Sequence, residues 1–154
     1  MNGLLVIGYG NPLRGDDGAG PEAARRVERL GLPGVIVIEC HQLLPEHAEA
    51  LSRVARAVFV DAHQELSDGG IEVTPMKPAE NPQIGSHASD PASLLALSKA
   101  LYGHAPEASL IAIPTRDFEL REGLSDLAAK CVEQAVTMIE TRLAPVLHGR
   151  ADNE

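Results

Sequence analysis

The stretch that decides the fold is VIGYGNPLRGDDGA, residues 6–19. Its apolar start predicts a buried strand, and Gly8 and Gly10 allow the backbone to turn sharply where that strand ends. Asp16 and Asp17 follow in a glycine-rich loop that leads into a helix. A strand, an acidic loop and a helix in this order put two carboxylates at the carboxyl edge of a sheet, where open α/β folds bind their ligands. One acid could simply complement the helix N-terminus, but an adjacent pair among so many glycines favours a functional site.

The composition is that of a globular protein with an aliphatic core. The chain has 154 residues, is 44% hydrophobic, and contains no Trp, two Tyr and two Phe. Its net charge of −9 argues against nucleic acid or an anionic membrane as the main partner. We find no signal peptide and no stretch that could span a bilayer. Cys40 and Cys131 are read as packing residues, and so few cysteines favour the reducing cytoplasm.

Apolar runs that alternate with helical patterns predict a mostly parallel sheet with helices on both faces. The expected strands are residues 4–7, 35–38, 57–60, 71–74 and 110–113, and the expected helices are residues 21–30, 45–51, 91–102 and 124–144. The strand at 71–74 alternates in hydropathy and is followed directly by Pro75, as is typical of a sheet edge. We expect a single α/β domain over residues 1–148 and a flexible tail over residues 149–154.

Two acidic side chains follow strands of this predicted sheet, and a histidine lies in a loop near them in the scheme. Asp17 follows the first strand, Asp61 ends the third, and His87 lies in the loop before a capped helix. The carboxyl ends of parallel strands meet at one edge, so Asp17 and Asp61 are expected to face each other. Two carboxylates and an imidazole suit a divalent transition metal. Taken singly, Asp61 could cap a turn and His87 could be an exposed loop residue.

Two other interpretations of the loop are a dinucleotide site and a receiver domain. The glycine pattern argues against a dinucleotide site, because Leu13 stands where the third glycine belongs, although Glu39 at the end of the second strand is weakly consistent with one. A phosphate-accepting receiver domain also has an acidic pair after strand one and an Asp after strand three. That domain needs a Lys after its fifth strand, where this chain has Pro-Thr-Arg at 114–116. No nucleophile elbow and no His-Glu-x-x-His motif is present.

The chain resembles the nickel–iron hydrogenase maturation endopeptidases over nearly its whole length. The matching residues are GYGNPLRGDDGAG at 8–20, VFVDA at 58–62, and His87. The resemblance implies a three-layer α/β/α sandwich on a five-stranded, mostly parallel sheet, with residues 71–74 as the antiparallel edge strand. Many members have Asp-Gly-Gly after the second strand. The segments at 39–46 and 86–91 are more similar to the branch that serves bidirectional and NAD-linked hydrogenases.

What the resemblance implies is a cytoplasmic, metal-dependent protease. It would remove the C-terminal extension of the hydrogenase large-subunit precursor once nickel has been inserted. By position, Asp17, Asp61 and His87 are its catalytic and metal-contacting residues. The nickel would be supplied by the precursor, although other divalent metals can occupy such a site in vitro. The alternatives are a non-catalytic, nickel-dependent scaffold protein and, less favoured, a receiver-like switch.

Four further residues are candidates for supporting the site or touching the substrate. Asp16 would orient the acidic loop, and Asn11 lies in the same loop. His63 is near enough to Asp61 to support it, and His41 follows the second strand.

Overall fold

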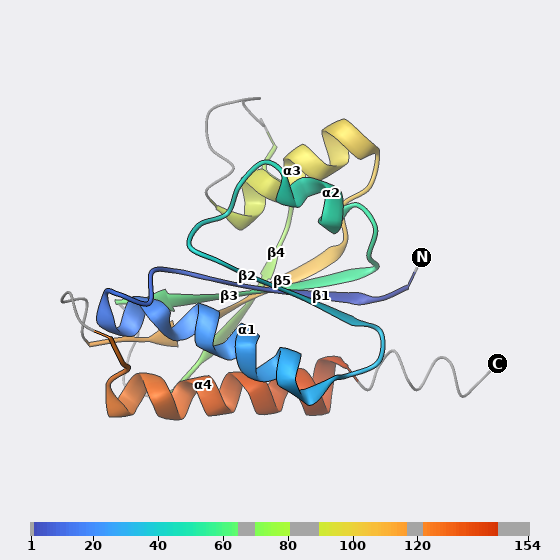
Figure 1. The fold of residues 1–154 in the computed structure, drawn as a ribbon. Helices are drawn as coiled ribbons and strands as arrows, with labels where there is room; N and C mark the ends of the chain where they lie inside the picture. Colours follow the sequence, from blue (N-terminus) through green and yellow to red (C-terminus); the bar gives the residue numbers. More distant parts are fainter. Residues whose placement is uncertain (1, 65–69, 81–89, 117–121, 145–154) are drawn as a thin grey trace.

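The computed structural model describes residues 2–64, 70–80, 90–116 and 122–144. Its strands form one sheet in the order β2-β1-β3-β5-β4 (Figure 1). The strands are β1 (Leu4–Tyr9), β2 (Val35–Cys40), β3 (Arg56–His63), β4 (Glu72–Met76) and β5 (Glu107–Pro114). All neighbouring pairs are parallel except β4 with β5. The predicted mostly parallel, five-stranded sheet with one antiparallel edge strand is therefore confirmed.

Helices cover both faces of the sheet and make three layers. The helical elements are η1 (Gly15–Gly18), α1 (Ala19–Leu30), α2 (His47–Leu51), α3 (Pro91–Tyr102), α4 (Asp126–Met138) and the π turn η2 (Ile139–Leu143). Helices α1 and α4 lie on one face, and α2 and α3 lie on the other (Figure 1). None of the helices in the described ranges is long and apolar enough to cross a membrane. The predicted tail at 149–154 lies outside the described residues.

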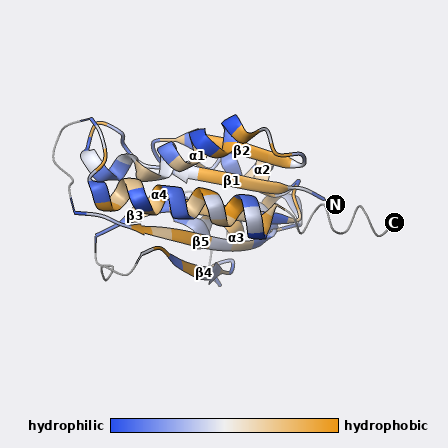
Figure 2. Cartoon of the chain, turned by 90° about the horizontal axis from the view of Figure 1, so that it is seen from below, coloured by the Kyte–Doolittle hydropathy of each residue, from blue (hydrophilic) through white to orange (hydrophobic). Residues whose placement is uncertain are grey.

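The core consists of two apolar layers divided by the sheet. Leu4 and Val6 of β1 face the α1 and α4 side, whereas Leu5 and Ile7 face the α2 and α3 side. Side chains alternate across a strand, so a strand buried on both faces reads as a continuous apolar run. In Figure 2, β1 and much of β5 are hydrophobic, while the helices alternate in hydropathy. Cys131 is buried in the first layer, as its position on the apolar stripe of the last helix predicted.

Helix ends follow the residue types that the sequence places there. Gly31 and Gly103 end α1 and α3 in the left-handed conformation that glycine adopts without strain. The Asp90 side chain accepts a hydrogen bond from the Ser93 N–H at 2.9 Å and caps α3. Ser125 caps α4 in the same way, so that helix begins at Asp126 rather than at residue 124.

All five strands differ from their predicted bounds by up to three residues, and two of these differences concern a candidate site residue and a proline. Strand β3 continues beyond residue 60 to His63, because β5 is long enough to pair with it up to Pro114. Asp61 therefore lies inside β3, with Ala112 as its partner, and not at the strand end. Pro75 lies within β4 rather than after it, opposite Ser109. A proline is tolerated there because β4 is an edge strand.

The start of α1 rests directly on the ends of β1 and β3. A Cβ atom on Gly20 would lie 2.4 Å from the Tyr9 carbonyl oxygen and 2.5 Å from that of Val60. One on Gly8 would lie 2.0 Å from the Gly20 carbonyl oxygen. Only glycine allows this approach, which holds the acidic loop between β1 and α1 against the sheet.

We predict that Gly20→Ala lowers the free energy of unfolding by about 3 kcal/mol, because the added methyl group meets two backbone oxygens that cannot move aside. Gly31→Ala is the control: its Cβ would meet nothing within 4 Å. Its left-handed conformation makes the expected loss only about 1 kcal/mol. Urea denaturation of both variants checks this, and equal losses would contradict it.

Candidate functional site

The carboxyl edge of the sheet brings Asp17 and Asp61 to one place. The register of β1 with β3 sets Gly8 beside Val60, so the next residues, Tyr9 and Asp61, are neighbours across the two strands. Asp17 follows β1 in η1, and its negative charge is close enough to raise the pKa of Asp61. The parallel arrangement thus joins two acids that are distant in the chain.

Backbone contacts of the acidic loop hold Asp17 in position. Its Oδ2 accepts a hydrogen bond from the Asn11 N–H at 2.7 Å, and its own N–H donates to the Arg14 carbonyl at 3.2 Å. The Asn11 side chain in turn accepts from the Leu13 N–H at 3.0 Å. Gly10 has a φ of +143°, and a Cβ there would lie 2.0 Å from the Asp17 carbonyl oxygen. The loop is therefore closed around Asp17 and leaves this carboxylate at the edge of the sheet.

Asp61 is a largely buried carboxyl group with three polar neighbours. Burial raises its pKa to about 6, and the charge of Asp17 adds to this. The opposing influences are His63, whose Nε2 lies 3.5 Å from Oδ2, the Ala62 N–H, which donates to Oδ1 at 2.9 Å, and the Tyr9 hydroxyl. A carboxyl group with a pKa near 6 exchanges its proton close to neutral pH.

Tyr9 is the residue that sequence reasoning missed. Its side chain is 8% exposed and its hydroxyl forms a hydrogen bond with the Asp61 side chain. Burial, followed by the charge of Asp61, raises the pKa of Tyr9 well above its usual range, so the hydroxyl stays protonated and donates. The strand register could have indicated this contact, because Tyr9 ends the strand that pairs with the one carrying Asp61.

Asp16 is fully buried, and its carboxylate is turned toward Arg116 and Ser125 rather than toward Asp61. Its Oδ1 accepts from the Ser125 N–H at 2.6 Å, and its Oδ2 accepts from the Ser125 hydroxyl at 2.7 Å and from the Arg116 N–H at 2.9 Å. These bonds connect η1 to the segment between β5 and α4. Asp16 thereby fixes the loop that carries Asp17, and its charge is compensated by charge-assisted hydrogen bonds.

The remaining predicted residues lie at different distances from the two acids. Asn11 and His63 contact Asp17 and Asp61 directly. His41 is exposed just after β2, whose last residue, Cys40, accepts a hydrogen bond from the Gly10 N–H at 3.1 Å. His87 lies outside the described residues. Within those residues no group of three His, Cys, Asp or Glu side chains is arranged to hold a metal ion.

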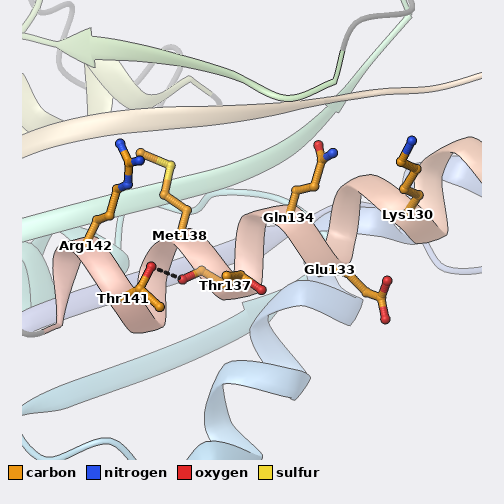
Figure 3. A pocket seen from close by; sticks show the side chains of 7 residues that line it. All are labelled: Lys130, Glu133, Gln134, Thr137, Met138, Thr141 and Arg142. Carbon is orange, nitrogen blue, oxygen red and sulfur yellow. Dashed lines mark hydrogen bonds between the residues drawn. The ribbon is translucent and has the colours of Figure 1, made fainter.

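A surface groove along α4 is separate from this site. It is lined by Lys130, Glu133, Gln134, Thr137, Met138, Thr141 and Arg142 (Figure 3). None of these residues is among the predicted site residues. The carboxyl edge of β1 and β3 therefore remains the candidate site.

We predict that Asp16→Asn destabilises the protein by about 3 kcal/mol, because it removes a compensated buried charge and leaves an amide donor facing the N–H groups of Ser125 and Arg116. Asp126→Asn is the control, as this acid lies in the first turn of α4 and makes none of these bonds. Urea denaturation should show a change below about 1 kcal/mol for the control. Similar losses in both variants would exclude a special role of Asp16.

We predict that Asp61→Asn stabilises the metal-free protein at neutral pH. The pKa of Asp61 is raised from 3.8 to about 6 on folding, so the unfolded chain loses this proton first and stability falls as pH rises between these values. Asn cannot ionise, and the variant should gain on the order of 2 kcal/mol at about pH 7.5 and less than about 1 kcal/mol at about pH 4. Urea denaturation in a chelator at both pH values measures this. An equal difference at both would contradict the prediction.

No family model matches the chain. A protein of Methanocaldococcus jannaschii assigned as a hydrogenase maturation protease is 28% identical over 143 residues, which cover 88% of this chain and 93% of that protein.

Solved structures give the same fold. The NiFe hydrogenase maturation protease HycI from Thermococcus kodakarensis matches with a TM-score of 0.71 at 24% identity, over 96% of this chain and 93% of its own. HybD from the same organism matches with a TM-score of 0.68 at 25% identity, over 94% and 99%. The endopeptidase HybD from Escherichia coli has a TM-score of 0.70 at 18% identity, over 90% of both chains. In sequence and in fold, this chain is similar to the hydrogenase maturation proteases.

Proposed function

We propose that this protein is an endopeptidase that removes the C-terminal extension of a nickel–iron hydrogenase large-subunit precursor after nickel insertion. The observation that carries the proposal is the meeting of Asp17 and Asp61 at the carboxyl edge of β1 and β3, with the pKa of Asp61 raised to about 6. The similarity to hydrogenase maturation proteases supports the same reaction class.

In this proposal, nickel belongs to the substrate. The carboxylates of Asp17 and Asp61, with the imidazole of His87, form a donor set that suits a divalent nickel ion with positions left for other ligands. They engage the ion that the precursor already holds. A precursor without nickel lacks this docking group, so cleavage depends on prior metal insertion.

Peptide hydrolysis requires a water molecule to lose a proton and the leaving nitrogen to gain one. Asp61 is suited to the proton transfer, because its pKa is raised to about 6 in the metal-free protein and one of its two carboxylate oxygens can contact the ion while the other accepts the proton. The Tyr9 hydroxyl donates to Asp61 and fixes its orientation. Asp17, held by the Asn11 N–H, would contact the nickel ion. The substrate's nickel supplies polarisation of the scissile carbonyl.

The partner and location that we propose follow from the sequence. The segments at 39–46 and 86–91 support a precursor from a bidirectional or NAD-linked hydrogenase. The two cysteines are free thiols, as befits the cytoplasm where such a precursor would be processed.

We predict that Asp17→Asn, Asp61→Asn and His87→Ala each slow precursor processing by 100-fold or more, because each removes a metal contact or the proton acceptor. Glu133→Gln is the matched control, since this acid lies in the α4 groove. Mass spectrometry of the nickel-loaded precursor measures the loss of the extension, and circular dichroism confirms that the variants fold.

Three results of this assay decide the proposal. Full processing by all three folded variants would end the site assignment. A precursor that wild-type protein binds and leaves uncut would replace the peptidase by the scaffold alternative. Running the assay with precursors from a bidirectional and from another class of hydrogenase tests the partner, and equal rates would remove the branch preference.

A further inference from the structure

Among the described residues, strand β2 presents an unpaired backbone edge. In the described part of the chain its only strand neighbour is β1, and Figure 2 shows it at the margin of the sheet opposite β4. Gly34 and Cys40 turn their carbonyls toward β1, where these accept from the Leu4 and Gly10 N–H groups at 3.0 Å and 3.1 Å. Backbone groups alternate in direction along a strand, so those of Val37 and Glu39 point outward.

The two edges of the sheet differ in how they are protected. Strand β4 contains Pro75, which has no N–H to offer a neighbouring strand. Strand β2, with the sequence VIVIEC, contains no proline, and its only charge, on Glu39, is paired with Arg25 at 2.5 Å. Ile36 is 54% exposed. An edge of β-branched residues without a blocking device is a template for pairing with an added strand.

A surface groove lies beside this edge, between β2 and α1. Ala24 and Val37 supply apolar surface in it, and the other lining residues carry charge. Those charged residues are Arg25, Glu28, Arg29 and Glu39. When a peptide adds to a sheet edge, main-chain hydrogen bonds give affinity and adjoining pockets for its side chains give specificity. The groove fits an aliphatic side chain of such a peptide.

We propose that the outer edge of β2 binds an extended segment of the precursor as a sixth strand of the sheet. This inference rests on the proposed function. The edge ends next to the site: Cys40 is bonded to Gly10, and the following residue, Asn11, binds Asp17. A segment paired with Val37 and Glu39 therefore extends toward the two acids. The occupant is an extended peptide with aliphatic side chains.

A second copy of this chain fits the edge less well. Each copy carries a net charge of −9, so two copies repel each other. The edge offers few outward backbone groups and one strongly exposed apolar side chain, Ile36. A stable dimer needs about 800 Å² of buried surface on each partner, which is more than one short strand supplies.

Amide hydrogen exchange of the full chain tests the pairing directly. The probe is a synthetic peptide that spans the cleavage site and C-terminal extension of the precursor. At saturation, the Val37 and Glu39 amides should exchange at least about 10-fold more slowly, whereas those of Ile36 and Ile38, which already face β1, should not change. Unchanged exchange at Val37 and Glu39 would overturn the proposal. So would slowing that depends on protein concentration without peptide, which would indicate self-association.

Processing kinetics give an independent readout. Val37→Pro removes an outward N–H but no bond to β1, and we expect KM for the nickel-loaded precursor to rise about 10-fold with kcat little changed. Val37→Thr keeps the N–H and should resemble wild type.

If the proline variant does not fold, Ile36→Lys blocks the edge with a charge and Ile36→Thr is its control. Cleavage by either folded blocking variant with unchanged KM overturns edge pairing and leaves the peptidase intact. Protection of Val37 and Glu39 without cleavage by wild type supports edge pairing and overturns the peptidase.

Discussion

The close backbone contact between the start of α1 and the ends of β1 and β3 is the constraint on which the site depends. Gly8 and Gly20 meet where no side chain fits, so the helix begins against the strands themselves. The loop between β1 and α1 must then fold back tightly, with Gly10 under the Asp17 carbonyl. A looser connection would leave Asp17 without a defined position relative to Asp61.

Three acids near this contact have different physical roles. Asp16 is buried, and hydrogen bonds from Ser125 and Arg116 compensate its charge. Asp17 receives the Asn11 N–H and stays at the sheet edge. Asp61 is largely buried with weaker compensation, which is why its pKa is raised to about 6. The first acid contributes to stability, whereas the ionised form of the third is held at an energetic disadvantage, as is common at functional sites.

The two edges of the sheet also differ, because one is blocked to a further strand and the other is not. One edge carries Pro75 and excludes further pairing, while β2 keeps its outward backbone groups available near the site. An added strand on β2 would supply the main-chain recognition that a peptidase for one protein substrate requires. Specificity would then come from the edge and the groove beside it, and chemistry from the acids at the end of β1 and β3.

The sequence by itself determined the strands, most helix ends and the edge position of the strand at 71–74, because apolar periodicity, glycines, prolines and capping residues act locally. The antiparallel direction of that strand was implied only by the resemblance to a known family. The sequence also predicted that Asp17 and Asp61 share one edge of the sheet. The extension of β3 past Asp61, the contact of Tyr9 with that acid, and the bonding of Asp16 to Ser125 came only from the tertiary structure. Each depends on the pairing or burial of segments far apart in the chain. Such contacts leave no periodic pattern in either segment alone, and for the same reason the free edge of β2 became visible only once the strand order was known.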